Sequence, residues 1–323
     1  MENVTKNNAC VDDYVTTVCV HDGMFHADEV VALAIVMLAL GENEVKYVRS
    51  RNYPDFTNAQ LVIDVGWSYD GIKFFDHHQP GFNKTHEGTD IKYSSAGLIW
   101  DRFCQGIATK YFGGFIGIDK LNDFYNRVVN GLILGIDAVD NGQYKETGAV
   151  HQNTLSSIVK TFNVSNYIAD WEEQRAAFDY ILKFVCAYLH NFIKGVVNSI
   201  IDEDIVRDAM NRAENGIMFL PKFIPGWKNF LLKADIQQKV KVCLVEAKPG
   251  EWSITSALKE SGSMEPLCPA PSRLRGTKTE DAAEFGNSKV IFVHKSGYTG
   301  SFKVDTKEDA MAVARLWIIN SGN

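Results

Sequence analysis

Apolar residues form two kinds of pattern over the first 140 residues. Residues 27–40 and 94–104 have the spacing and composition of helices, and paired serines at the start of the second suit an N-cap. Short continuous apolar runs, which are typical of buried strands, occur at 17–20, 45–48, 61–65 and 73–75. Strands that alternate with helices in this way predict a parallel sheet with helices packed on it.

Helical spacing dominates the middle of the chain. Apolar residues recur at helical intervals over 122–139, and Asp140-Asn141-Gly142 then supplies a turn that ends the helix. A second apolar stripe over 170–201 predicts one long helix. We interpret this helix as a connector between two domains.

The pattern returns to strands after about residue 216. Strands are predicted at 241–246, 252–255 and 289–294, and a final helix at 306–319. The fold class is therefore α/β, with a parallel-sheet domain, a helical connector and a smaller α+β domain. The predicted boundaries are 1–165, 166–215 and 216–323.

Composition and charge narrow the class of protein. A chain of 323 residues with 46% apolar residues is expected to be globular, and the apolar run at 30–40 is shorter than a membrane-spanning helix. The first twenty residues lack a signal peptide or presequence, so we expect a soluble, cytoplasmic protein without a membrane partner. A net charge of -7 means that any contact with nucleic acid is local.

Candidate metal ligands follow the predicted strands. His21, His26 and Asp28 come directly after the first strand, and Asp76-His77-His78 ends the fourth. Open α/β sheets bind their ligands at the carboxyl ends of the strands. Asp64 interrupts a buried apolar run, where an unpaired charge costs several kcal/mol unless a partner or a metal compensates it. Each residue alone is more often structural, but their recurrence at successive strand ends favours a metal site.

The types of residue restrict the metal. Carboxylates and imidazoles without cysteine favour Mn²⁺ over Ca²⁺. These ligands do not distinguish Mn²⁺ from Zn²⁺ or Co²⁺. About six ligands exceed the number that one tetrahedral ion needs, whereas two divalent ions bridged by a carboxylate fit them. Such a pair of ions is typical of enzymes that cleave phosphoesters.

Several motifs together resemble the Myg-type exonuclease family of the DHH phosphoesterase superfamily. They are His-x-Gly-x-Phe-His-x-Asp-Glu from residue 21, Asp-His-His-Gln from residue 76, Ser-Ser-Ala-Gly-Leu from residue 94, the segment 136–142 and the segment 291–297. The resemblance implies a DHH-type catalytic domain and a C-terminal domain that closes over substrate. It also implies metal-dependent 3′ to 5′ removal of nucleotides from RNA or single-stranded DNA.

The resemblance also implies roles for individual residues. Asp64 would bridge two ions, His78 would face the substrate phosphate or the leaving oxygen, and Asp76 would orient a neighbouring imidazole. Asp140 competes with Asp137 as a ligand, because residues three apart lie on the same side of a helix. The implied metal ligands are His21, His26 and Asp64 for one ion, and Asp28, Asp64, His77 and Asp137 for the other.

The substrate-binding residues are expected in the C-terminal domain. Arg275 and His294 would position phosphate oxygens, Tyr298 would stack on a base, and Gly297 and Gly300 would bring backbone N–H groups to a phosphate. The same glycines also suit an ordinary hairpin turn. Two other functions stay open: a phosphohydrolase of pyrophosphate or short oligonucleotides, which the low positive charge favours, and a non-catalytic nucleic-acid-binding protein.

Overall fold

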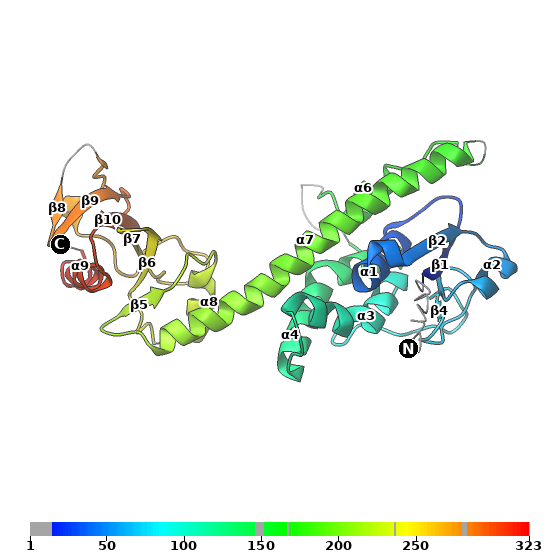
Figure 1. The fold of residues 1–323 in the computed structure, drawn as a ribbon, viewed down its shortest axis with the longest axis horizontal. Helices are drawn as coiled ribbons and strands as arrows, with labels where there is room; N and C mark the ends of the chain where they lie inside the picture. Colours follow the sequence, from blue (N-terminus) through cyan, green and yellow to red (C-terminus); the bar gives the residue numbers. More distant parts are fainter. Residues whose placement is uncertain are drawn as a thin grey trace, which may run out of the picture. The chain divides into compact units, whose positions relative to one another are not determined.

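The computed structural model describes residues 15–145, 152–166, 168, 170–235, 237–279 and 283–322. Within these ranges the chain divides into two units, Met1–Val197 and Asn198–Asn323, and each has its own sheet (Figure 1). The cytoplasmic location was predicted from the first twenty residues. Residues 1–14 of this segment lie outside the described residues. The predicted domain boundaries stay a prediction.

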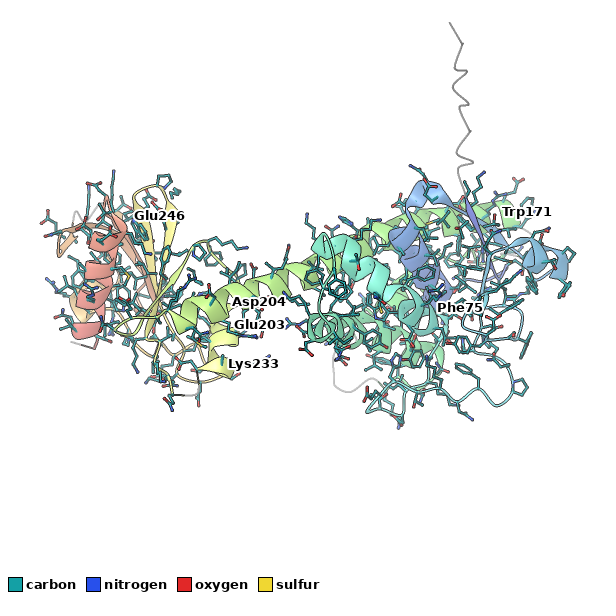
Figure 2. The ribbon with its side chains drawn as sticks, turned by 60° about the horizontal axis from the view of Figure 1, so that its bottom comes forward. Phe75, Trp171, Glu203, Asp204, Lys233 and Glu246 are labelled. Carbon is teal, nitrogen blue, oxygen red and sulfur yellow. The ribbon has the colours of Figure 1, made fainter. Side chains whose placement is uncertain are left out.

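A parallel sheet forms the centre of the first unit. Its strands are β1 (Thr16–Val20), β2 (Val45–Arg49), β3 (Leu61–Ile63) and β4 (Phe74–Phe75), in the order β2-β1-β3-β4. Every pair is parallel, with Val18 opposite Tyr47 on one side and Leu61 on the other. Phe75, which ends β4, is fully enclosed in the core (Figure 2). The predicted α/β class is confirmed.

Helices of the first unit begin close to the carboxyl ends of these strands. α1 (Ala27–Leu40) packs against α3 (Ser95–Phe112), whose N-cap Ser94 accepts a hydrogen bond from the N–H of Ala96. The helix expected at 122–139 is a continuous series of α4 (Ile118–Val128), the π-helical turn η2 (Val129–Ile133) and α5 (Leu134–Asp140). Short elements complete this unit: η1 (Glu42–Glu44), α2 (Tyr53–Asn58) and α6 (Leu155–Lys160).

The long helix α7 (Trp171–Asn211) covers the stretch where the connector was predicted. Eight residues of the expected stripe are buried: Phe178, Ile181, Leu182, Val185, Leu189, Ile193, Val197 and Ile200. By length and composition alone, α7 is also long and apolar enough to cross a membrane. Core helices of soluble proteins pass the same test, so this finding leaves the expectation of a soluble protein as it was.

The second unit contains a mixed sheet in the order β5-β6-β7-β10-β9-β8. β5 is parallel to β6 and the other pairs are antiparallel. α9 (Lys307–Ile319) packs on this sheet and buries Trp317 beside Phe302. The other elements are β5 (Ile217–Leu220), α8 (Trp227–Ala234), β6 (Val242–Lys248), β7 (Glu251–Ser256), η3 (Ser272–Leu274), β8 (Glu284–Phe285), β9 (Ser288–Val293) and β10 (Thr299–Lys303).

Candidate metal centre

Three neighbouring strands of the first unit end in metal-binding types of side chain. His21 follows β1, Asp64 follows β3, and Asp76, His77 and His78 follow β4. Because the strands are parallel and adjacent, their carboxyl ends lie at one edge of the sheet. The first turn of α1 adds Asp28 and Glu29 at the same edge. The sequence prediction of a cluster at the strand ends therefore agrees with the structure.

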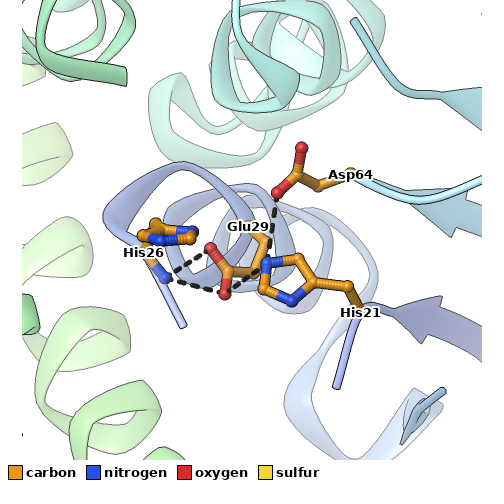
Figure 3. Close-up of side chains that lie close together, drawn as sticks. All are labelled: His21, His26, Glu29 and Asp64. Atoms are coloured by element: carbon orange, nitrogen blue, oxygen red, sulfur yellow. Dashed lines mark hydrogen bonds and ion pairs between the residues drawn. The ribbon is translucent and has the colours of Figure 1, made fainter. Parts of the chain in front are cut away.

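The first group of candidate ligands joins β1, α1 and β3. His21, His26, Glu29 and Asp64 offer ligand atoms that all lie within 4.8 Å of one another (Figure 3). The Nε2 atom of His21 lies 3.0 Å from Glu29 Oε1 and 3.3 Å from Asp64 Oδ2. Burial lowers the pKa of His21, but the charge of Glu29 and the hydrogen bonds to both carboxylates raise it to about 10.

Glu29 was not among the predicted ligands, although it belongs to the motif that begins at His21. Both of its carboxylate oxygens accept a hydrogen bond from the N–H of His26, at 2.8 Å, which completes the start of α1. The side chain is fully buried and also contacts His21. Its position three residues after the N-cap was the sequence feature that could have identified it, but this feature is equally typical of an ordinary capping box.

The second group shares Asp64 with the first. Asp64, Asp76, His77 and His78 place their ligand atoms within 4.8 Å of one another. The Oδ1 atom of Asp64 lies 3.6 Å from His77 Nδ1 and 3.5 Å from His78 Nδ1. Ser95, the first residue of α3, donates a hydrogen bond to the same oxygen at 3.1 Å. Asp64 thus stands between two groups, as the predicted bridging role requires.

The third group consists of Asp28, His77 and Asp140. His77 Nε2 lies 2.9 Å from Asp140 Oδ2, and this contact holds the pKa of Asp140 below its ordinary value although burial alone would raise it. Asp28 is buried, and neither of its carboxylate oxygens has a hydrogen-bond partner among the described residues. Burial, together with the charges of Asp64 and Asp140, raises its pKa well above the ordinary value.

An unpaired buried carboxylate points to a cation. Desolvation of a charged group costs several kcal/mol unless a partner or a metal compensates it. A divalent ion would compensate the charge of Asp28 and of its acidic neighbours at once. The donor set of imidazole and carboxylate groups fits a borderline divalent ion such as Mn²⁺ or Zn²⁺.

The structure brings Asp140 into these groups and leaves Asp137, the preferred candidate of the sequence analysis, outside them. Asp137 accepts hydrogen bonds from Ser94 Oγ at 2.6 Å and the N–H of Gly97 at 3.3 Å, and its Oδ2 lies 2.6 Å from His86 Nε2. Three residues advance a helix by about 4.5 Å, so the two side chains reach different neighbours. Asp137 joins α5 to the start of α3, whereas Asp140 faces His77.

Asp76 holds the imidazole of His78 in place. Its Oδ1 lies 2.8 Å from His78 Nδ1 and accepts the backbone N–H of the same residue at 3.0 Å. Burial would raise the pKa of Asp76, but these hydrogen bonds and one from the N–H of Trp67 lower it. The hydrogen bond with Asp76 raises the pKa of His78, whose side chain is half exposed. This is the orienting contact expected of Asp76.

A cavity of about 670 Å³ lies directly against the ligand groups. His21, His26, Asp28, Asp64, Asp76, His78 and Asp140 line it. Two cationic residues that the sequence analysis did not single out also line it: Arg51, two residues beyond β2, and Lys160 at the end of α6. Arg51 pairs with Asp22 at 3.0 Å. Their positions at one cavity depend on the fold and not on any sequence motif.

The predicted substrate-binding residues lie in the second unit. Arg275 Nε donates to the carbonyl of Ala270 at 2.8 Å, and a Cβ atom at Gly297 would lie only 2.9 Å from that Nε. The rings of His294 and Tyr298 are 4.8 Å apart. The four predicted residues 275, 294, 297 and 298 thus lie around the turn between β9 and β10. The fifth, glycine 300, lies within β10 and pairs with both neighbouring strands.

The chain is similar to one family over nearly its whole length. A family model named for the MYG1 exonuclease, and described as an uncharacterised protein family, UPF0160, matches residues 17–318. The MYG1 protein YER156C of Saccharomyces cerevisiae is 29% identical, over 93% of this chain and 94% of its own. The MYG1 exonuclease of Homo sapiens is 27% identical, over 91% of this chain and 84% of its own.

Among solved structures, RecJ of Thermus thermophilus in complex with Mg²⁺ is 13% identical, with a TM-score of 0.27. The similarity covers 94% of this chain and 49% of that chain, so this chain spans about half of RecJ. An uncharacterised protein of Helicobacter pylori has a TM-score of 0.28 at 10% identity. Scores of this size carry no argument about function.

Proposed function

Because the chain belongs to the MYG1 exonuclease family, UPF0160, we propose that it is a metal-dependent phosphodiesterase that removes nucleotides from RNA or single-stranded DNA in the 3′ to 5′ direction. The observation that carries this proposal is the set of three overlapping ligand groups, which share Asp64 and His77. The buried, unpartnered carboxylate of Asp28 supports it, because a cation would compensate its charge.

We propose two Mn²⁺ ions as the cofactor. The first would be held by His21, His26, Glu29 and Asp64, and the second by Asp28, Asp64, His77 and Asp140. Divalent ions at such a site supply two effects, a lower pKa for water and neutralisation of phosphate charge. The shared carboxylate of Asp64 supports a pair of ions, since one residue lies between both groups.

Residues of the chain would complete the reaction. His78 is half exposed at the cavity, and its hydrogen bond with Asp76 favours the protonated imidazole. It would therefore donate a proton to the leaving oxygen as a general acid. Arg51 and Lys160 would bind non-bridging phosphate oxygens in the same cavity.

The second unit would bind the rest of the nucleic acid. Arg275 and His294 would contact phosphate oxygens, Tyr298 would stack on a base, and the backbone around Gly297 would approach a phosphate. The cation of Lys228, which lies 4.9 Å from the ring of Tyr298, adds positive charge there.

We also propose that the protein is cytoplasmic. Fractionation of cells that express the full chain tests this location.

The test is release of mononucleotides from end-labelled single-stranded RNA and DNA with Mn²⁺, alongside pyrophosphate and a dinucleotide. We expect stepwise trimming from the 3′ end by the wild type and a loss of at least about 100-fold for Asp64→Ala and His77→Ala, because both remove shared ligands. His190→Ala, which alters an exposed histidine bonded to Tyr111, is the control and should keep its activity.

Each other outcome has a definite meaning. Hydrolysis of pyrophosphate and the dinucleotide alone would replace the exonuclease by a small-molecule phosphohydrolase with the same metal centre. Trimming from the 5′ end would refute the proposed direction. Full activity of Asp64→Ala would refute the catalytic role of the metal centre itself.

A further inference from the structure

An exposed tryptophan lies beside the metal centre. Trp67 is three residues beyond Asp64, lines the same cavity and has 70% of its surface exposed. Its ring centroid lies 6.1 Å from that of His78. Single exposed aromatic side chains are common on protein surfaces, so it is the position of Trp67 at this cavity, and not its exposure, that points to a ligand.

The backbone around Trp67 has an unusual conformation. Trp67 has a φ of 55° and Asp64 a φ of 58°, both in the left-handed region that residues other than glycine seldom adopt. The N–H of Trp67 donates to Asp76 Oδ2 at 2.7 Å, which ties the loop to the residue that orients His78. Strained residues of this kind cost about 1 to 3 kcal/mol each and gather at functional sites. Packing of the indole does not explain the strain, since most of the ring is exposed.

The surroundings of Trp67 suit a nucleoside phosphate. The ligand groups, Arg51 and Lys160 attract phosphate, while Trp67 and Met24 offer apolar surface in the same cavity. Bases stack on aromatic rings whatever their sequence, because every base has a π face.

We propose that Trp67 stacks on the base of the nucleotide whose phosphate enters the metal centre, which makes it a specificity-determining residue. The inference rests on the proposed function and adds a base-recognition element within the first unit. The enzyme would therefore bind nucleotides in preference to phosphates that lack a base. Purines, with their larger ring surface, would be bound more tightly than pyrimidines.

Calorimetric binding of adenosine monophosphate and of ribose 5-phosphate, with Mn²⁺ present, tests the proposal. The wild type should bind the nucleotide about 5- to 150-fold more tightly than the sugar phosphate, which is the range that one stacked base contributes. Trp67→Ala should lose this preference and keep its affinity for ribose 5-phosphate, whereas Trp67→Phe should keep part of the preference. Trp171→Ala, at the exposed first residue of α7, is the matched control (Figure 2).

The sugar phosphate shows whether the variant site has kept its structure. An equal loss of affinity for both ligands in Trp67→Ala would overturn the proposal, because it would indicate damage to the cavity instead of lost stacking. A wild type without preference for the nucleotide, or a Trp67→Ala variant that keeps it, would overturn it as well.

The two proposals can fail separately. A wild type that does not trim RNA, yet shows a nucleotide preference that depends on Trp67, refutes the exonuclease and supports the stacking site. Trimming of RNA with no such dependence supports the exonuclease and refutes the stacking site.

Discussion

Replacement of Asp28 by asparagine should stabilise the metal-free protein while it weakens the response to metal. Asp28 is buried among Asp64 and Asp140, and its oxygens have no hydrogen-bond partner among the described residues. The amide of asparagine carries no charge and would donate an N–H···O hydrogen bond to the neighbouring carboxylate of Asp140. Hydrogen bonds to charged groups contribute about 1.5 to 3 kcal/mol. At about 2 to 4 °C per kcal/mol, the melting temperature of the first unit should rise by roughly 3 to 12 °C.

The assay is thermal unfolding followed by circular dichroism, in chelator and then in Mn²⁺. Each ion at one hundred times its dissociation constant stabilises the wild type by about 2.7 kcal/mol, and Asp28→Asn should lose the contribution of the second ion, which Asp28 would hold. Asp137→Asn is the matched control, because Asp137 is equally buried but fully hydrogen-bonded. That variant should lose about 1 to 3 kcal/mol and keep its response to metal.

The dependence on pH follows from the raised pKa of Asp28. A carboxyl group whose pKa is higher in the folded than in the unfolded state binds its proton more tightly when the protein is folded. It therefore destabilises the fold as the pH rises above 3.8, the ordinary pKa of an aspartate. The advantage of Asp28→Asn should therefore shrink as pH falls from 7 towards 4. A variant that is less stable than the wild type in chelator, or that keeps the full response to Mn²⁺, would refute the reasoning.

Two further predictions concern Gly97 and His21. A Cβ atom at Gly97 would lie 2.2 Å from Asp137 Oδ2, so Gly97→Ala should cost about 1 to 3 kcal/mol or more in urea unfolding, while Gly106→Ala, which meets nothing within 4 Å in the same helix, should gain stability. A loss for Gly106→Ala as large as that for Gly97→Ala would contradict this. The pKa of about 10 keeps His21 protonated at pH 8 without metal, so binding of Mn²⁺ should release at least one proton there. Calorimetric titrations in buffers of different ionisation enthalpy measure this release, and identical enthalpies in all buffers would rule it out.

Local sequence was sufficient for the elements that carry the metal centre. The apolar run before His21 and the helical stretch that follows it predicted β1 and α1, because each element depends on its own periodicity. The position of Asp64 inside an apolar run was enough to predict a buried charge. Residues at strand ends are brought together by any parallel sheet, so the cluster itself was also predictable.

The choice among neighbouring candidates depended on contacts between distant segments. Asp137 and Asp140 are equivalent in the sequence, and the decision between them comes from His86 and Ser94, which lie 51 and 43 residues from Asp137. The π-helical turn before α5 was not predicted. The apolar spacing over 122–139 was interpreted as one regular helix.

Residue type and spacing were enough to predict the strands, the helix after the first strand, and the imidazole and carboxylate groups at their ends. Which of those groups meet, that Glu29 joins them, and that Arg51, Trp67 and Lys160 line the same cavity became visible in the packed fold. Residue type and periodicity act locally. A ligand set or a cavity, in contrast, is defined by distances between segments that only the packed fold brings together.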